Sequence, residues 1–171
     1  MFLKQPKQTD LHAVANWRNT VPESLRTHGE TTYRQQDKFF EDVICNPQSK
    51  HKYFGAYVDK KMVALTGLTD VDYVNGNAEL SLIVDPRQNG KGYGKQAISQ
   101  ILNYGFNTLR LRYIFGECYY CNPAIGFWQK VCNQYNAIVV DLPFRKFWNG
   151  QHHHSMYFTI SWEDFNGANN T

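Results

Sequence analysis

The sequence lacks long runs of apolar residues, and none approaches 18 residues, roughly the length of a membrane-spanning helix. It also lacks long basic runs, because its 18 Lys and Arg are spread along the chain and the formal net charge is only +3. Generic binding to nucleic acid therefore has little support. The stretch from Met1 to Pro6 is too short and too polar for a signal peptide. We expect a cytoplasmic protein without membrane contact.

Cysteine is scarce, and its four copies do not form a metal motif. Cys118 and Cys121 form a C-x-x-C, but no second pair stands at zinc-finger spacing. The histidines at 152–154 cannot all bind one ion from a regular strand, because alternate side chains point to opposite faces. We therefore predict no metal site.

Length and hydrophobic periodicity indicate one domain that spans residues 1–171. A chain of this length buries about 70% of its unfolded surface in a single core. Apolar periodicity and turn residues predict a mixed order of elements. The expected strands are 2–5, 53–58, 62–72, 78–84, 112–120, 137–140 and 154–160. The expected helices are one that Thr9 or Asp10 caps and that carries Leu11 to Trp17, one at 35–44, one that follows the glycine-rich segment to about residue 109, and one opening at 122–123. This order predicts an α+β fold with a mixed sheet of about seven strands flanked by about four helices.

A glycine-rich segment, Gly90-Lys91-Gly92-Tyr93-Gly94, lies between an expected strand and an expected helix. The first turn of a helix has unpaired N–H groups, and glycine lets the backbone approach an anion closely. Arg87 and Lys95 add positive charge on either side. Two common nucleotide motifs fail here: Asn89 stands where a P-loop needs its first glycine, and Lys95 stands where the dinucleotide fingerprint needs its third. The segment therefore predicts an anion site of another kind.

Residues 84–94 resemble the pyrophosphate-binding segment of GNAT N-acetyltransferases, and residues 122–130 resemble a second conserved segment of that family. The element order is similar to that fold over nearly the whole chain. Trp17-Arg18-Asn19 and residues 148–152 resemble the branch that holds ribosomal-protein alanine and nucleotide-amino-sugar acetyltransferases.

The resemblance implies acetyl-CoA as the cofactor. It places the pantetheine arm on the backbone of Leu82, Ile83 and Val84. The residues implied around the pyrophosphate are Arg87, Gln88, Asn89, Gly90, Lys91, Gly92, Tyr93, Gly94 and Lys95, and those implied from the second segment are Asn122, Trp128 and Lys130.

Three positions depart from the pattern of the family. Asn89 stands where Gln or Arg is usual, and Asn122 lies one residue closer to its helix than is common. Trp128 occupies the place where many members carry a Tyr that protonates the leaving thiolate.

Direct attack on a thioester requires a neutral amine. Removing the proton from an amine with a pKa of about 10.4 costs roughly 4.6 kcal/mol at pH 7. A general base that accepts this proton therefore speeds the reaction. Glu79 is the candidate base, because it precedes the expected thioester end of its strand. Tyr120, or its neighbour Tyr119, is the candidate replacement for the missing acid. The thiol of CoA has a pKa near 8.5 and leaves with little help.

The acceptor is expected to contact the variable parts of the chain: residues 17–32, the turn at 75–76 and residues 144–154. Trp17, Arg18, Arg26 and His28 are the candidate acceptor residues, and the two arginines and the histidine suit an anionic acceptor. We expect a small-molecule amine, such as an amino sugar, or a peptide amine at a protein N-terminus. The alternatives are a CoA-binding sensor without catalysis and an acyltransferase that modifies nucleic acid. The protein is expected to be a monomer or a homodimer.

Overall fold

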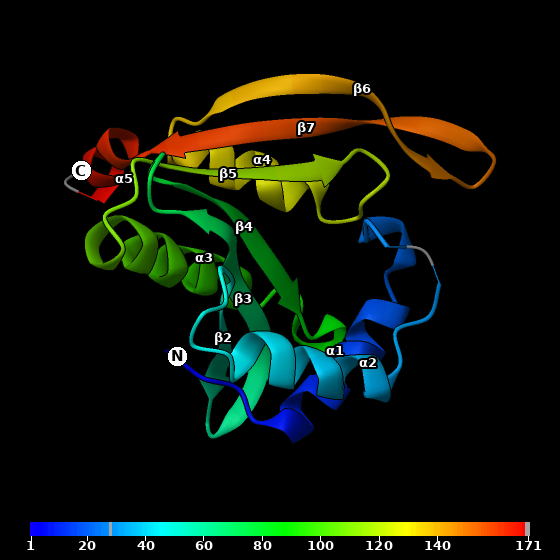
Figure 1. Cartoon of the computed structure of the whole chain (residues 1–171). Helices are drawn as coiled ribbons and strands as arrows, with labels where there is room; N and C mark the ends of the chain where they lie inside the picture. The colour runs from blue at the N-terminus through cyan, green and yellow to red at the C-terminus, as the bar shows by residue number, and fades with distance from the viewer. Residues whose placement is uncertain (28, 170–171) are drawn as a thin grey trace.

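The computed structural model describes residues 1–27 and 29–169 and has a seven-stranded mixed sheet with five α-helices (Figure 1). The strands are β1 (Phe2–Lys4), β2 (Lys52–Val58), β3 (Lys61–Asp72), β4 (Asn77–Val84), β5 (Tyr113–Tyr119), β6 (Ile138–Trp148) and β7 (Gln151–Ser161). The helices are α1 (Gln8–Asn19), α2 (Tyr33–Phe39), α3 (Tyr93–Asn103), α4 (Ile125–Gln134) and α5 (Trp162–Asn169). The predicted α+β class and the seven strands are confirmed.

The strands lie in the order β1-β2-β3-β4-β5-β7-β6, and only the β4–β5 pair is parallel. This pair is joined at three positions, from Asn77 opposite Tyr113 to Glu79 opposite Phe115. Beyond Glu79 the two strands diverge, as Figure 1 shows. The sheet therefore opens in its middle, beside the second half of β4.

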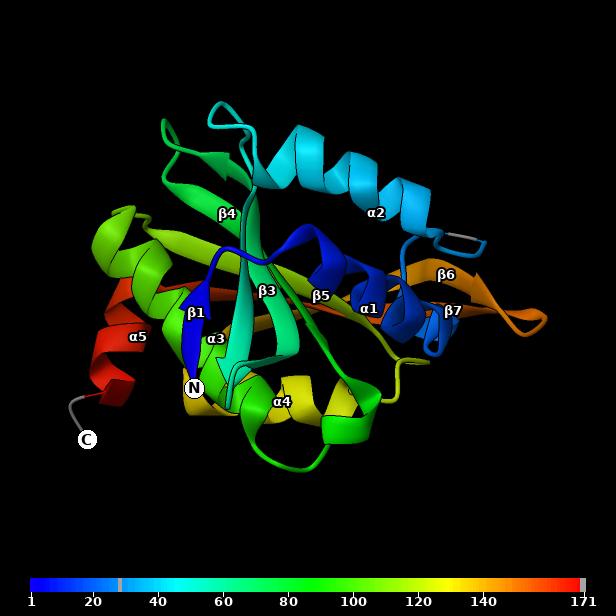
Figure 2. The same cartoon turned by 90° about the horizontal axis from the view of Figure 1, so that it is seen from below.

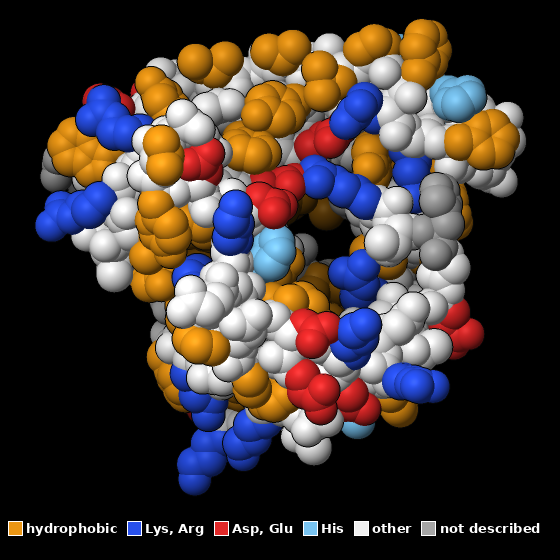
Figure 3. All heavy atoms as spheres, in the orientation of Figure 1, with side chains coloured by type: hydrophobic (Ala, Val, Ile, Leu, Met, Phe, Trp, Pro, Cys, Tyr) orange, Lys and Arg blue, Asp and Glu red, His pale blue; other side chains and the backbone are white. Residues whose placement is uncertain are grey.

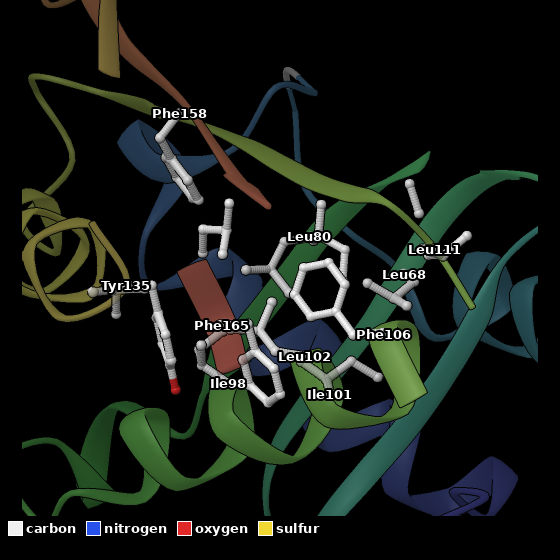
Figure 4. Packing of buried hydrophobic residues seen from close by; sticks show 14 of the residues in the cluster. Leu68, Leu80, Ile98, Ile101, Leu102, Phe106, Leu111, Tyr135, Phe158 and Phe165 are labelled. Carbon is white, nitrogen blue, oxygen red and sulfur yellow. The ribbon is translucent and has the colours of Figure 1, made fainter. Parts of the chain in front are cut away.

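Helices cover both faces of the sheet, with α3 and α4 on one face and α1 and α2 on the other (Figure 2). The larger core lies under α3 and α4, where Leu80, Ile98, Phe106 and Phe158 come together from separate elements (Figure 4). Burial of each such side chain contributes about 1.5–3 kcal/mol. On β4, Ala78 and Leu80 are buried, whereas Glu79 on the other face lines a cleft described below. The core therefore fixes which β4 side chains remain free for chemistry.

The C-terminal part differs from the sequence prediction. Strands β6 and β7 form a long hairpin through residues 144–154, which were expected to be a loop. Its turn is Asn149-Gly150, and both residues have positive φ, 50° and 80°. Asn-Gly favours this two-residue turn, so the signal was present. The alternation of polar and apolar residues that marks a half-buried strand is missing from this stretch, because β6 is a largely exposed edge strand.

One helix start was also wrong, and one helix was missing from the sequence prediction. Helix α4 begins at Ile125, after a turn in which the Asn122 carbonyl Oδ1 accepts from the Ala124 backbone N–H at 2.8 Å. The short helix α5 was not expected from the sequence. None of the helices in the described ranges is long and apolar enough to cross a membrane.

Candidate active site

The glycine-rich turn starts at a buried carboxylate, Asp85, directly after β4. Its Oδ1 accepts from the Arg87 backbone N–H and from Arg87 Nε, both at 3.0 Å, and its Oδ2 accepts from Arg87 Nη2 at 3.0 Å. Burial works against ionisation of Asp85, but these bonds outweigh it and lower the pKa of the carboxyl. The predicted cofactor residue Arg87 therefore also holds the turn in shape.

Gly90 and Gly92 have φ values of +78° and +77°, a region that L side chains adopt at a cost of about 1–2 kcal/mol. A Cβ atom added at either glycine meets no atom within 4 Å, so the space in front of the turn is open. The first backbone bond of α3 runs from the Gln96 N–H to the Gly92 carbonyl at 3.2 Å. Residues 93–95 form the first turn of α3, where backbone N–H groups have no acceptor within the helix, and no loop or turn bond given for the described residues has its donor at residues 90–95. This open row of donors fits a diphosphate.

The second half of β4 has a free edge beside this turn. Leu82, Ile83 and Val84 pair with β3 on one side, and β5 has already diverged on the other. Their backbone groups on the open side are free to bond an extended ligand. The predicted backbone positions for a pantetheine arm therefore lie on an exposed strand edge that leads to the turn.

The second conserved segment meets the turn through Phe127. A Cβ added at Gly94 would lie 3.3 Å from the Phe127 ring, so the starts of α3 and α4 are neighbours. Trp128 packs on Phe127 and on Phe158, with ring centroids 5.2 and 5.4 Å apart, and belongs to the edge of the core. Its position indicates a packing role beside the predicted cofactor role.

The lysines near this region lie at the surface. Lys91 Nζ donates to Gln88 Oε1 at 2.8 Å, and Lys95 is exposed at the start of α3. Lys130 is exposed on α4. All three ammonium groups are therefore accessible to an anionic ligand.

A second group of side chains lies where β4 and β5 diverge. Glu79 and Glu117 extend from the same face of these neighbouring strands and are only 15% and 7% exposed. Arg26 Nη1 donates to Glu79 Oε2 at 2.9 Å, and Arg26 Nη2 contacts Glu79 Oε1 and, at 3.4 Å, Glu117 Oε2. Figure 3 shows a deep hollow at the centre of this view, with acidic and basic side chains around its rim. We call the region of Arg18, Arg26, Glu79, Glu117 and Arg145 the charged cleft.

Glu117 and Arg145 were not predicted from the sequence. Arg145 Nε donates to Glu117 Oε1 at 3.0 Å, and Ser155 Oγ donates to the same oxygen at 2.6 Å. Burial raises the pKa of Glu117, but these two bonds outweigh it and the net pKa is lowered. Predicting that Glu117 meets Arg145 requires the register of β5 on β7 and of β7 on β6, which the sequence does not give.

Lys146 connects the hairpin to the segment that carries Arg26. It is 4% exposed, and its Nζ donates to the Leu25 carbonyl. The same Nζ lies 5.5 Å from the centroid of the Tyr119 ring. Because Arg26 follows Leu25 in the chain, this bond helps to hold Arg26 over the carboxylates.

The predicted acceptor residues separate into two groups. Arg26 and Arg18 lie at the charged cleft, and Arg18 donates to Thr27 Oγ1 at 3.2 Å and to Thr31 Oγ1 at 3.4 Å. Trp17 is only 4% exposed and packs in the core under α1, so it is not an open contact surface. His28 lies outside the described residues.

The two candidate tyrosines face different partners. The Tyr120 hydroxyl donates to Asp141 on β6, and this bond raises the pKa of Tyr120. Tyr119 lies instead near Arg26 and Glu117, and burial raises the pKa of its hydroxyl. Neighbouring residues on a strand point to opposite faces, so only one of them can reach the charged cleft.

A pocket of about 620 Å³ lies elsewhere, between Leu3, Phe54, α3 and α5. Its lining contains amides and aromatic rings but no Asp, Glu, Lys, Arg or His. None of the predicted site residues lines it. The candidate active site is therefore the divergence of β4 and β5, because the free strand edge, the open amides and the paired charges meet there.

Comparison with known proteins bears on the family and on the fold. A model of the acetyltransferase (GNAT) domain family matches residues 1–126. The spermidine N(1)-acetyltransferase of Vibrio cholerae serotype O1 is 31% identical over 113 residues, which cover 66% of this chain and 64% of that protein. The chain therefore matches less than two thirds of that relative's length.

Solved structures agree on the fold. The V. cholerae spermidine N-acetyltransferase in complex with CoA and spermine has a TM-score of 0.84 and 20% identity, with 96% of this chain and 97% of that chain covered. A structure of mutant forms of the V. cholerae spermidine/spermine N-acetyltransferase has a TM-score of 0.81 and 20% identity, with 98% of this chain and 97% of that chain covered.

These matches do not support the predicted branch of ribosomal-protein alanine and amino-sugar acetyltransferases, because the relatives named here are polyamine acetyltransferases. The motifs that indicated this branch, near Trp17 and Trp148, are short, and the one near Trp148 lies outside the matched region. The match over residues 1–126 covers most of the sequence, so the chain belongs to the GNAT acetyltransferase family.

Proposed function

We propose that this protein is an acetyl-CoA-dependent N-acetyltransferase that acetylates a primary amine by direct attack. The observation that carries the proposal is the row of open N–H groups at residues 90–95, directly beside the free edge of β4. A diphosphate on those amides aligns an extended arm along residues 82–84. The far end of the arm then points to the charged cleft, where carboxylates are available for proton transfer.

Acetyl-CoA, when bound, supplies the activated acetyl group. The amides of residues 90–95 hold its diphosphate, and a β4 backbone N–H polarises the carbonyl. Glu79 would accept the proton of the amine, directly or through a water molecule. As the new N–C bond forms, the C–S bond of the thioester would break and CoA would leave as a thiolate, whose thiol has a pKa of about 8.5. Both oxygens of Glu79 contact Arg26, and each keeps a further lone pair with which it can accept a proton.

The acceptor is a small-molecule amine in this proposal. The relatives named above are spermidine acetyltransferases, which makes polyamines the first acceptors to test. Amino sugars and peptide N-termini, suggested by the branch resemblance, serve as comparison acceptors in the same assay.

Thermal shift with acetyl-CoA, followed by thiol release with these amines, tests the proposal. We expect stabilisation by acetyl-CoA and turnover with at least one primary amine. Stabilisation without turnover of any amine would favour a CoA-binding sensor. Absence of stabilisation at millimolar acetyl-CoA would overturn the proposal.

A further inference from the structure

Arg18 is a half-buried cation that has no carboxylate partner among the described residues. In that part of the chain its guanidinium donates hydrogen bonds only to the hydroxyls of Thr27 and Thr31. Within residues 1–27 and 29–169 it forms no ion pair, whereas Arg26, Arg87 and Arg145 each do. Burial lowers the pKa of the Arg18 guanidinium, because partial removal from water disfavours its charged form. Buried charges are normally paired, so this position favours an anionic partner.

Arg18 belongs to the charged cleft rather than to a separate surface. It interacts electrostatically with the hydroxyl of Tyr53, which donates to Ser81 Oγ at 3.4 Å. Ser81 extends from the same face of β4 as Glu79. Thr27, which receives a bond from Arg18, directly follows Arg26.

The balance of charge around the cleft is positive. Arg26 and Arg145 are matched by Glu79 and Glu117. Arg18 and the buried Lys146, which bonds a carbonyl, have no carboxylate partner among the described residues. The charged cleft together with Lys146 thus carries two more positive than negative side chains, an excess that attracts anions and repels polycations.

We propose that the acceptor amine also carries a carboxylate or phosphate group, which binds Arg18. A guanidinium offers paired donors in the planar geometry that suits these anions. The bound anion directs the amine of the same molecule toward Glu79, on the same face of the sheet. This inference rests on the proposed function and makes Arg18 a specificity-determining residue. A polyamine brings only positive charge and finds both carboxylates already paired.

Matched pairs of acceptors test this proposal: phosphoethanolamine against ethanolamine, lysine against cadaverine, and glucosamine 6-phosphate against glucosamine, with spermidine as the polycation. We expect kcat/KM at least about 10-fold higher for the anionic member of a pair. In Arg18→Gln this preference is lost while the acetyl-CoA shift stays. Arg112→Gln is the matched control, because Arg112 pairs with exposed Glu163 near the start of β5.

A second measurement does not depend on the identity of the acceptor. With the turn at residues 90–95 saturated by CoA, inorganic phosphate should raise the Tm of the wild type more than chloride at equal ionic strength, and Arg18→Gln should abolish the difference. The inference is overturned if spermidine or the uncharged partners are used as well as the anionic amines. It is also overturned if no amine is turned over and phosphate gives no Arg18-dependent shift. By contrast, loss of the acetyl-CoA shift itself would refute the proposed function.

Discussion

The glycine-rich turn takes its binding groups from one continuous stretch, residues 85–95, and offers mainly backbone N–H groups. The charged cleft takes its groups from α1, the segment around Arg26, β4, β5 and β6, and offers side chains. A ligand at the turn therefore meets a preformed row of donors. A ligand at the cleft meets ion pairs, which it must rearrange.

This difference predicts that substitutions in one region change the affinity for acetyl-CoA, whereas substitutions in the other change the kinetics with the acceptor. A change at the turn should act on acetyl-CoA binding. A change in the cleft should act on turnover or on the KM of the acceptor, with acetyl-CoA affinity preserved.

The largest effect is expected for Gly92→Glu at the turn. The substitution puts a side chain at φ +77° and a negative charge in the open space before the N–H row. We expect acetyl-CoA affinity to fall at least about 100-fold, a loss of roughly 2.8 kcal/mol, measured by calorimetry. Gly150→Glu is the matched control, because Gly150 also has a positive φ of 80° and an open Cβ position, in the β6–β7 turn. Equal losses in both variants would contradict a specific role of the turn.

Glu79→Gln should act on the chemistry rather than on the cofactor. Without the carboxylate, a protonated amine loses its proton acceptor, and we expect kcat to fall about 10–100-fold. The deficit should be largest below pH 8, where more of the amine is protonated. Glu163→Gln, which removes an exposed carboxylate paired with Arg112, serves as the control. A pH–rate profile parallel to that of the wild type would remove Glu79 from the mechanism.

Lys146→Met tests whether the hairpin positions Arg26. The bond to the Leu25 carbonyl disappears, and we expect the free energy of unfolding to fall by about 1–3 kcal/mol. The acceptor KM should rise about 5-fold, while acetyl-CoA affinity stays constant. Lys4→Met removes an exposed lysine whose Nζ lies 4.2 Å from the centroid of the Tyr57 ring, and should leave the KM unchanged. Loss of acetyl-CoA affinity in Lys146→Met would show that the two regions are not separable.

The smallest effect is expected for Trp128→Tyr, which introduces the residue that many family members have. Because Trp128 packs on Phe158, we expect a stability loss of about 1 kcal/mol, measured by urea unfolding. Since a thiol of pKa about 8.5 leaves readily, turnover should change less than about 3-fold. A large gain in kcat would instead show that proton donation to the thiolate limits the enzyme. Trp162→Tyr, at a partly exposed position in α5, is the comparison.

The amino-acid sequence was sufficient for the part of the molecule whose groups are neighbours along the chain. Gly90 and Gly92 marked the turn, Asn75-Gly76 marked the entry to β4, and alternation assigned the faces of β4. Each of these signals is local, because a turn or a strand face depends on a few adjacent residues. The family resemblance rested on residues 84–94 and 122–130, which are also local segments, and on the order of the elements.

Only the tertiary structure decided how the charges of the cleft pair. Glu117 and Arg145 are 28 residues apart, and Arg26 and Glu79 are 53 apart. Their contacts depend on strand register, on the divergence of β4 from β5 and on the β6–β7 hairpin crossing toward residue 25. The same packing gives Arg18 no carboxylate partner within residues 1–27 and 29–169. Such pairings follow from the sum of many weak contacts across the core, which no local pattern encodes.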